Sequence, residues 1–111
     1  LNSLILVSLK NRYATYFKLI VQKEKMTDEP IFAFVLMPFN DEFDDIYKFG
    51  IKEPAKNIGI NAERVDEQLY SEGMLSRIYS QIDQADLIIT DMTGRNPNVF
   101  YEVGYAHAKN K

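Results

Sequence analysis

The sequence predicts a three-layer α/β protein, in which a parallel sheet lies between two layers of helices. Three observations support this: strand-like and helix-like segments alternate, two strand-like segments are almost wholly apolar, and turn-forming residues separate the segments. Crossovers between parallel strands are right-handed and place helices on both faces of the sheet. The expected order is one N-terminal helix followed by β-α-β-α-β-α, which gives three strands.

The first 29 residues are predicted to form a basic amphipathic helix or linker, and residues 30–111 the α/β domain. Residues 4–7 are apolar, but a membrane span needs roughly 20 such residues, so we expect no stable membrane insertion. A helix bound to a membrane surface is the alternative. Because Lys109, Asn110 and Lys111 stand where another strand is expected, we expect a domain truncated after the third strand–helix unit.

Composition limits the function. The chain has 111 residues, no Cys and one His, which excludes a disulfide framework or thiolate metal site and argues against a His-based zinc site. We therefore expect no metal and a cytoplasmic protein. Residues 1–25 hold five basic residues and one acidic residue, which gives them a net charge of +4. Because the whole chain has a net charge of −3, residues 26–111 have a net charge of −7. Such an acidic body argues against nucleic-acid binding.

Residues 31–37 are continuously apolar, which predicts a strand covered on both faces. A helix is expected over residues 41–58, with Asp41 as its N-cap and Gly59 at its C-terminal stop. Pro54 is expected to kink or divide this helix.

A second strand is expected over residues 60–65 and a third over residues 85–91. Between them, residues 71–84 have helical periodicity. The apolar residues that we expect this helix to present to the core are Met74, Leu75, Ile78, Tyr79 and Ile82. Asn96 and Pro97 open the final helix, with Asn96 as N-cap and Pro97 at the first helical position.

Ligands bind open parallel sheets beyond the carboxyl ends of the strands. Residues 37–40, 65–67 and 91–96 arrive at that edge. Glu102 lies early in the final helix, and Asn98 shares its helical face. Because the N-terminal half of a helix favours an ionised carboxylate, we expect Glu102 to be charged and directed into a cleft.

The Met-Pro-Phe triplet at residues 37–39 and the segment ADLIITDMTGRNPNVFYEVGYAHAKNK at residues 85–111 resemble the nucleoside 2-deoxyribosyltransferase-like superfamily. They look closest to its bacterial branch of TIR-like, nucleotide-processing domains. The resemblance covers about residues 31–111. It implies a flavodoxin-like fold and cleavage at the N-glycosidic bond of a nucleoside, nucleotide or dinucleotide. NAD is then a candidate substrate and not a cofactor, no cofactor is expected, and we expect a homo-oligomer.

The resemblance also implies roles for individual residues. Glu102 would be the nucleophile that attacks the anomeric carbon, as in a retaining glycosidase. Asp91 would be an acid or a ribose contact. The remaining predicted substrate-binding residues are Pro38, Phe39, Arg95, Asn96 and Asn98, with Arg95 pairing with a phosphate and Phe39 stacking on a base or ribose.

One position departs from the family. The nucleoside-cleaving relatives have an acid on the helix before the third strand, but residues 77–79 are Arg, Ile and Tyr, and Asp86 lies at the wrong end of the strand. A leaving group that needs no proton would suit such a site, and nicotinamide leaves NAD as a neutral molecule. This favours NAD or a related nucleotide.

Structural explanations remain open at each position. Glu102 could be a solvated helical acid, Asp91 a turn cap, Asn96 only an N-cap, and Phe39 a core aromatic. His107 is expected to be non-catalytic, and Gly104 is expected to let the helix approach the sheet.

At the level of the whole protein, two other interpretations remain open. One is a non-catalytic, nucleotide-sensing or protein-interaction TIR-like module of a bacterial signalling or defence protein. The other is a fragment that is completed by strands from another chain.

Overall fold

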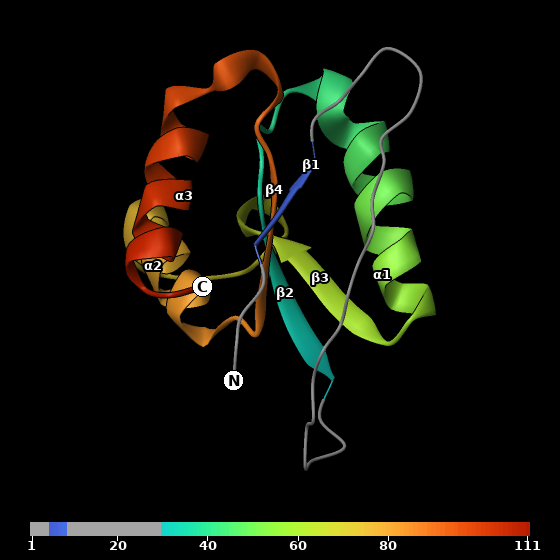
Figure 1. Ribbon diagram of the computed structural model, residues 1–111, viewed down its shortest axis with the longest axis horizontal. Helices are drawn as coiled ribbons and strands as arrows, with labels where there is room; N and C mark the ends of the chain where they lie inside the picture. Colours follow the sequence, from blue (N-terminus) through green and yellow to red (C-terminus); the bar gives the residue numbers. More distant parts are fainter. Residues whose placement is uncertain (1–4, 9–29) are drawn as a thin grey trace.

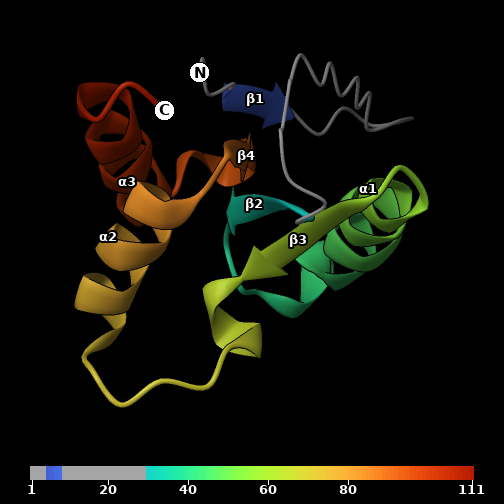
Figure 2. The same cartoon turned by 90° about the horizontal axis from the view of Figure 1, so that it is seen from below.

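The computed structural model describes residues 5–8 and 30–111, and within them it has the expected three-layer α/β arrangement (Figure 1). The sheet is parallel, with strand order β1-β4-β2-β3. Its strands are β1 (Ile5–Ser8), β2 (Ile31–Leu36), β3 (Ile60–Arg64) and β4 (Leu87–Asp91). One face is covered by the helical segment after β2, and the other by α2 (Met74–Gln84) and α3 (Pro97–Ala108) (Figure 2).

Strand β2 is buried on both faces, as its apolar run predicts. Ala33, Val35 and Met37 belong to the core cluster beneath the helical segment that follows β2. Phe34 and Leu36 alternate with them and belong to the cluster beneath α2 and α3. The period of two along a strand therefore divides one continuous apolar run between two cores.

The N-terminal prediction is wrong for residues 5–8. Instead of a helix, Ile5–Ser8 form β1, which pairs in parallel with β4, placing Ile5 opposite Ile88 and Ser8 opposite Asp91. The sheet thus has a fourth strand that we did not count, and Ile5 and Val7 are β-branched residues that favour strands. The amphipathic helix expected further along lies outside the described residues. Within the described part of the chain, no helix is both long and apolar enough to cross a bilayer.

The segment after β2 is helical but irregular. Its parts are η1 (Asp41–Phe43), a π-helical segment η2 (Ile46–Lys52) and α1 (Glu53–Asn57). Pro54 cannot donate a backbone hydrogen bond and its ring crowds the carbonyl four residues earlier, so widened turns before it relieve the crowding. Asn40, not Asp41, is the N-cap, and its side chain makes no capping hydrogen bond.

Most other expected boundaries are confirmed. Gly59 ends the segment with φ of 81°, and Asn96 and Pro97 open α3. Helix α2 begins at Met74 and not at residue 71, and it has Gly73 as its N-cap. Ile78 and Ile82 face the core as expected, whereas Met74 and Leu75 are each 50% exposed, which corrects their expected place in the core.

The expected role of Gly104 is also wrong. It lies on the exposed side of α3, and a Cβ added there would meet no atom of the described residues within 4 Å. Gly104 therefore does not bring α3 closer to the sheet. It lowers the stability of the helix, because glycine loses more backbone entropy on folding than other residues do.

We expect Gly104→Ala to stabilise the protein by about 0.5–1 kcal/mol, because alanine has the higher helix propensity and meets open space. Urea unfolding monitored by circular dichroism measures the change. Gly59→Ala is the control, and it should destabilise by about 1 kcal/mol because its φ is left-handed. A lower midpoint for Gly104→Ala would show that Gly104 has a packing role.

Candidate functional site

The candidate site lies where the chain changes face around β2. From β2 the chain crosses one face of the sheet to β3, then returns across the other face to β4, which lies on the opposite side of β2. Such a reversal leaves a crevice at the carboxyl ends of the two strands that flank it. A cavity of about 390 Å³ opens there, lined by the loop after β2 (residues 37–40), the start of α2, and the N-terminal half of α3 with its cap.

Glu102, the sixth residue of α3, is the one acid among the described residues that line this cavity. Burial raises the pKa of its carboxyl from 4.5 to about 7. We expected the helix dipole to keep it ionised, and this is corrected: the dipole acts mainly within the first turn, and loss of water outweighs it. Glu102 therefore lies close to the midpoint of its titration at neutral pH.

Asn96 and Asn98 both line the cavity at the start of α3. Asn96 Oδ1 accepts hydrogen bonds from the backbone N–H groups of Asn98 at 2.9 Å and Val99 at 3.4 Å. The N-cap assignment is thus confirmed, and this cap fixes where α3 begins. Since Glu102 is on the same helix, the cap also sets the position of its carboxyl.

Asp91 does not line the cavity. Its side chain is fully buried at the end of β4, and Oδ1 accepts a hydrogen bond from the Thr93 backbone N–H at 2.9 Å. Its second oxygen, Oδ2, has no hydrogen-bond partner among the described residues. The structural explanation therefore holds for Asp91: it caps the turn that leads to Asn96.

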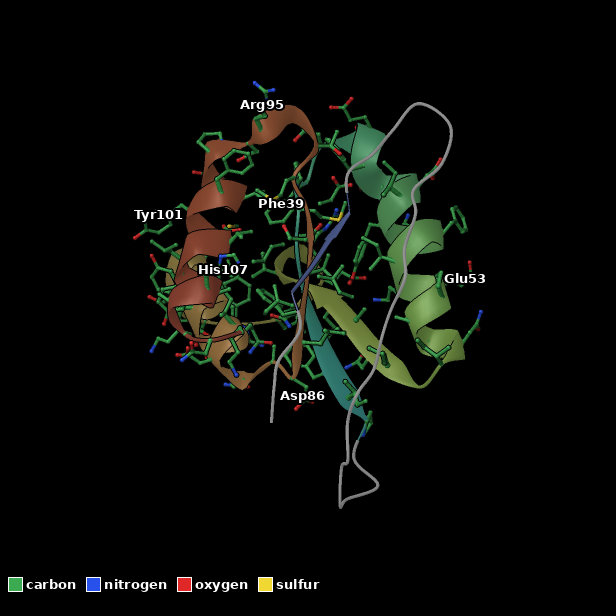
Figure 3. The ribbon with its side chains drawn as sticks, viewed as in Figure 1. Phe39, Glu53, Asp86, Arg95, Tyr101 and His107 are labelled. Carbon is green, nitrogen blue, oxygen red and sulfur yellow. The ribbon has the colours of Figure 1, made fainter. Side chains whose placement is uncertain are left out.

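Arg95 is also outside the cavity. Its backbone has a left-handed φ of 54°, and its exposed side chain points away from the body of the protein (Figure 3). Pro38 and Phe39 do line the cavity, and Phe39 is 40% exposed, so it is not a core aromatic. No Lys, Arg or His is among the described residues that line the cavity.

Sequence reasoning missed several lining residues, among them Met74, Leu75 and Tyr101. Helical periodicity assigned the first two to the core, and nothing in the sequence distinguished Tyr101 from its neighbours. Tyr101 is 63% exposed and accepts a hydrogen bond from the Tyr79 hydroxyl at 2.9 Å. That hydrogen bond is the main cause that raises the pKa of Tyr79 to about 12.

The other polar candidates lie away from the cavity. Asp86 is at the amino end of the sheet (Figure 3), where its Oδ2 accepts the Phe32 backbone N–H at 2.9 Å, as its position in the sequence predicts. His107 is exposed and does not line the cavity.

No protein-family model matches the chain, and no curated protein or solved structure matches it either. The resemblance of residues 31–111 to the nucleoside 2-deoxyribosyltransferase-like superfamily therefore stays a prediction.

The raised pKa of Glu102 predicts a dependence of stability on pH. The carboxyl binds a proton more tightly in the folded protein than in the unfolded chain. Its contribution to the free energy of unfolding is therefore complete below about pH 4.5 and is lost as the pH rises through about 7. Because Gln does not ionise, Glu102→Gln should be more stable than the wild type at pH 8, by about 1–2 kcal/mol after solvent screening, but not at pH 4. Urea unfolding of both proteins at pH 4 and pH 8 measures their free energies of unfolding. The same difference between variant and wild type at both pH values would contradict the prediction.

Proposed function

We propose that the cavity binds a nucleoside or nucleotide and that Glu102 cleaves, or transfers at, its N-glycosidic bond. The observation that carries this proposal is a single half-buried carboxyl in a cavity at the face reversal of a parallel sheet. The resemblance noted for residues 37–39 and 85–111 points to the same chemistry. NAD and nucleosides are both within this proposal.

The reaction follows from the chemistry of a carboxylate. A Glu102 oxygen attacks the anomeric carbon, the N-glycosidic bond breaks, and its electron pair leaves with the base. The covalent glycosyl–enzyme ester is then attacked at the same carbon by water or another acceptor hydroxyl. The acceptor loses its proton to solvent, Glu102 leaves as a carboxylate, and the anomeric configuration is retained.

The composition of the cavity favours a particular leaving group. Among the described residues, no second acid lines the cavity to protonate a departing base, and Asp91 lies outside the lining. A base that is cationic while attached, such as nicotinamide, departs as a neutral molecule without a proton. The aromatic faces of Phe39 and Tyr101, with no basic residue in the described lining, also suit a positively charged ring.

The direction of the pH dependence separates a nucleophile from a general acid. Only ionised Glu102 attacks, so kcat/KM for NAD or a nucleoside should rise between pH 5 and 8, with a midpoint near 7. Base release measured by chromatography across this range gives the profile. A kcat/KM that falls over the same range would assign Glu102 as an acid instead.

Glu102→Gln should abolish base release, because an amide cannot form the ester. The assay incubates the protein with nucleosides, nucleotides and NAD and measures the free bases. Glu53→Gln is the matched control: Glu53 is an exposed acid on α1, remote from the cavity (Figure 3), and this variant should retain activity. Undiminished turnover by Glu102→Gln would remove the nucleophile assignment.

The second candidate is a nucleotide-sensing or protein-interaction module without catalysis. The lack of a second carboxyl or a base in the described lining favours it, since the cavity then offers binding without proton transfer to the leaving group. A nucleotide would raise the melting temperature by mass action while no base is released. For either function, a cytoplasmic homo-oligomer remains our prediction.

A further inference from the structure

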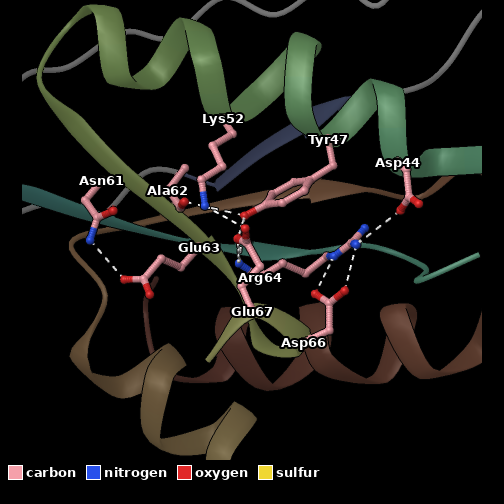
Figure 4. Close-up of polar contacts among 9 residues, drawn as sticks. All are labelled: Asp44, Tyr47, Lys52, Asn61, Ala62, Glu63, Arg64, Asp66 and Glu67. Atoms are coloured by element: carbon pink, nitrogen blue, oxygen red, sulfur yellow. Dashed lines mark hydrogen bonds and ion pairs between the residues drawn. The ribbon is translucent and has the colours of Figure 1, made fainter. Parts of the chain in front are cut away.

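Arg64 is a buried cation at the carboxyl end of β3, and it stands behind the wall of the cavity. Its side chain is 5% exposed, and Nε and Nη2 donate to the two carboxylate oxygens of Asp66 at 2.6 and 2.8 Å. Nη2 also lies 3.4 Å from Asp44 Oδ1 (Figure 4). Burial opposes the charge, but the hydrogen bonds to the two carboxylates outweigh it and raise the pKa of Arg64.

The same guanidinium contacts the segment that forms the cavity wall. Nη1 donates to the Pro38 carbonyl at 3.4 Å, and Cζ lies 5.3 Å from the centroid of the Phe39 ring. Cζ also lies 4.5 Å from the centroid of the Tyr47 ring. Pro38 and Phe39 line the cavity, whereas Arg64 does not. The guanidinium therefore links the β3 turn to the back of the Pro38–Phe39 wall.

A second set of polar contacts holds this arrangement in place. The Tyr47 hydroxyl donates to Glu67 and accepts the Arg64 backbone N–H at 3.1 Å, while Lys52 Nζ lies 2.6 Å from the other Glu67 oxygen (Figure 4). Tyr47 is buried, so the ring behind the guanidinium has little freedom to move. A planar guanidinium with five donors makes the ion pair, the carbonyl contact and the ring contacts simultaneously, which an ammonium cannot do.

We propose that Arg64 is a positioning residue, which fixes the Pro38 backbone and the Phe39 ring so that Phe39 presents a set face to the planar base of the ligand. The part that concerns a ligand rests on the proposed function. The part that concerns Phe39 does not, and it can be tested without any ligand. The contacts to Pro38 and Phe39 distinguish this role from an ion pair alone, since they reach the cavity wall, whereas Asp66 and Asp44 keep 35% and 40% of their side chains exposed.

The ligand-free test uses Phe39→Trp, which supplies the sole indole because the chain has no Trp. Acrylamide quenching and fluorescence anisotropy report the exposure and mobility of this introduced indole. Adding Arg64→Met or Arg64→Lys should increase quenching and lower anisotropy. Arg77→Met is the matched control, since Arg77 also lies over an aromatic ring, that of Tyr70, and does not line the cavity. Indole signals that respond equally to the Arg64 and Arg77 variants, or to neither, would overturn the proposal.

The ligand test measures KM and kcat for NAD or a nucleoside with Phe39 intact. Arg64→Met should raise KM about tenfold, equivalent to about 1.4 kcal/mol, with kcat unchanged. Arg64→Lys should fall between it and the wild type. A loss confined to kcat, or equal KM values for the Arg64→Met and Arg77→Met variants, would contradict positioning of the ligand.

A third variant covers the case in which Arg64→Met does not fold. Asp66→Asn removes the carboxylate charge that pairs with Arg64, at a side chain that is partly exposed to solvent. It should raise KM, and in the Phe39→Trp background it should raise indole quenching, both by smaller factors than Arg64→Met. If no panel compound is turned over or bound, the proposed function fails while the fluorescence measurements still decide whether Arg64 holds the wall.

Discussion

The arrangement depends on one constraint, which is that β2 must be covered on both faces. Its residues alternate between two apolar clusters, so helices have to lie on each side of the sheet. The chain meets this demand by crossing one face on the way to β3 and the other on the way to β4. The segments that leave the carboxyl ends of β2 and β4 turn to opposite faces of the sheet, and the cavity lies between them. The location of the site is therefore a consequence of burying β2.

Two ionisable groups on opposite sides of the cavity, Arg64 and Glu102, have different environments. Behind the Pro38–Phe39 wall, Arg64 is buried but has carboxylate, carbonyl and aromatic partners. On α3, Glu102 has lost water and gained no cationic partner within the described lining, so its pKa rises. The first group is charged and fully paired, and the second has a raised pKa because it has lost water. If Glu102 is the nucleophile that we propose, a rigid Pro38–Phe39 wall would help it, because a nucleophile needs a ligand held at a set distance.

Signals within a few residues of each other were sufficient to predict much of this fold. The apolar run of β2, the left-handed Gly59 and the Asn96–Pro97 start of α3 each depend on local backbone preferences. The positions of Glu102, Phe39 and both asparagines followed once the strand ends were known. The failures involve distant parts of the chain. Pairing of β1 with β4 joins segments far apart in the sequence, and periodicity gives the apolar face of α2 but not how much of it α3 covers, so Met74 and Leu75 were misplaced.

The polar groups at the two ends of β4 are paired to different extents among the described residues. At the amino end, Asp86 exchanges hydrogen bonds with the Phe32 backbone in both directions. At the carboxyl end, Thr90 Oγ1 and Asp91 Oδ2 are buried without a hydrogen-bond partner among the described residues, and Glu102 resists ionisation nearby on α3. Unpaired buried polar atoms each cost free energy, so sequences optimised for stability alone would remove them. Among the described residues, these unpaired atoms lie at the end of the sheet that carries the cavity, whereas the polar groups of Asp86 at the amino end are paired.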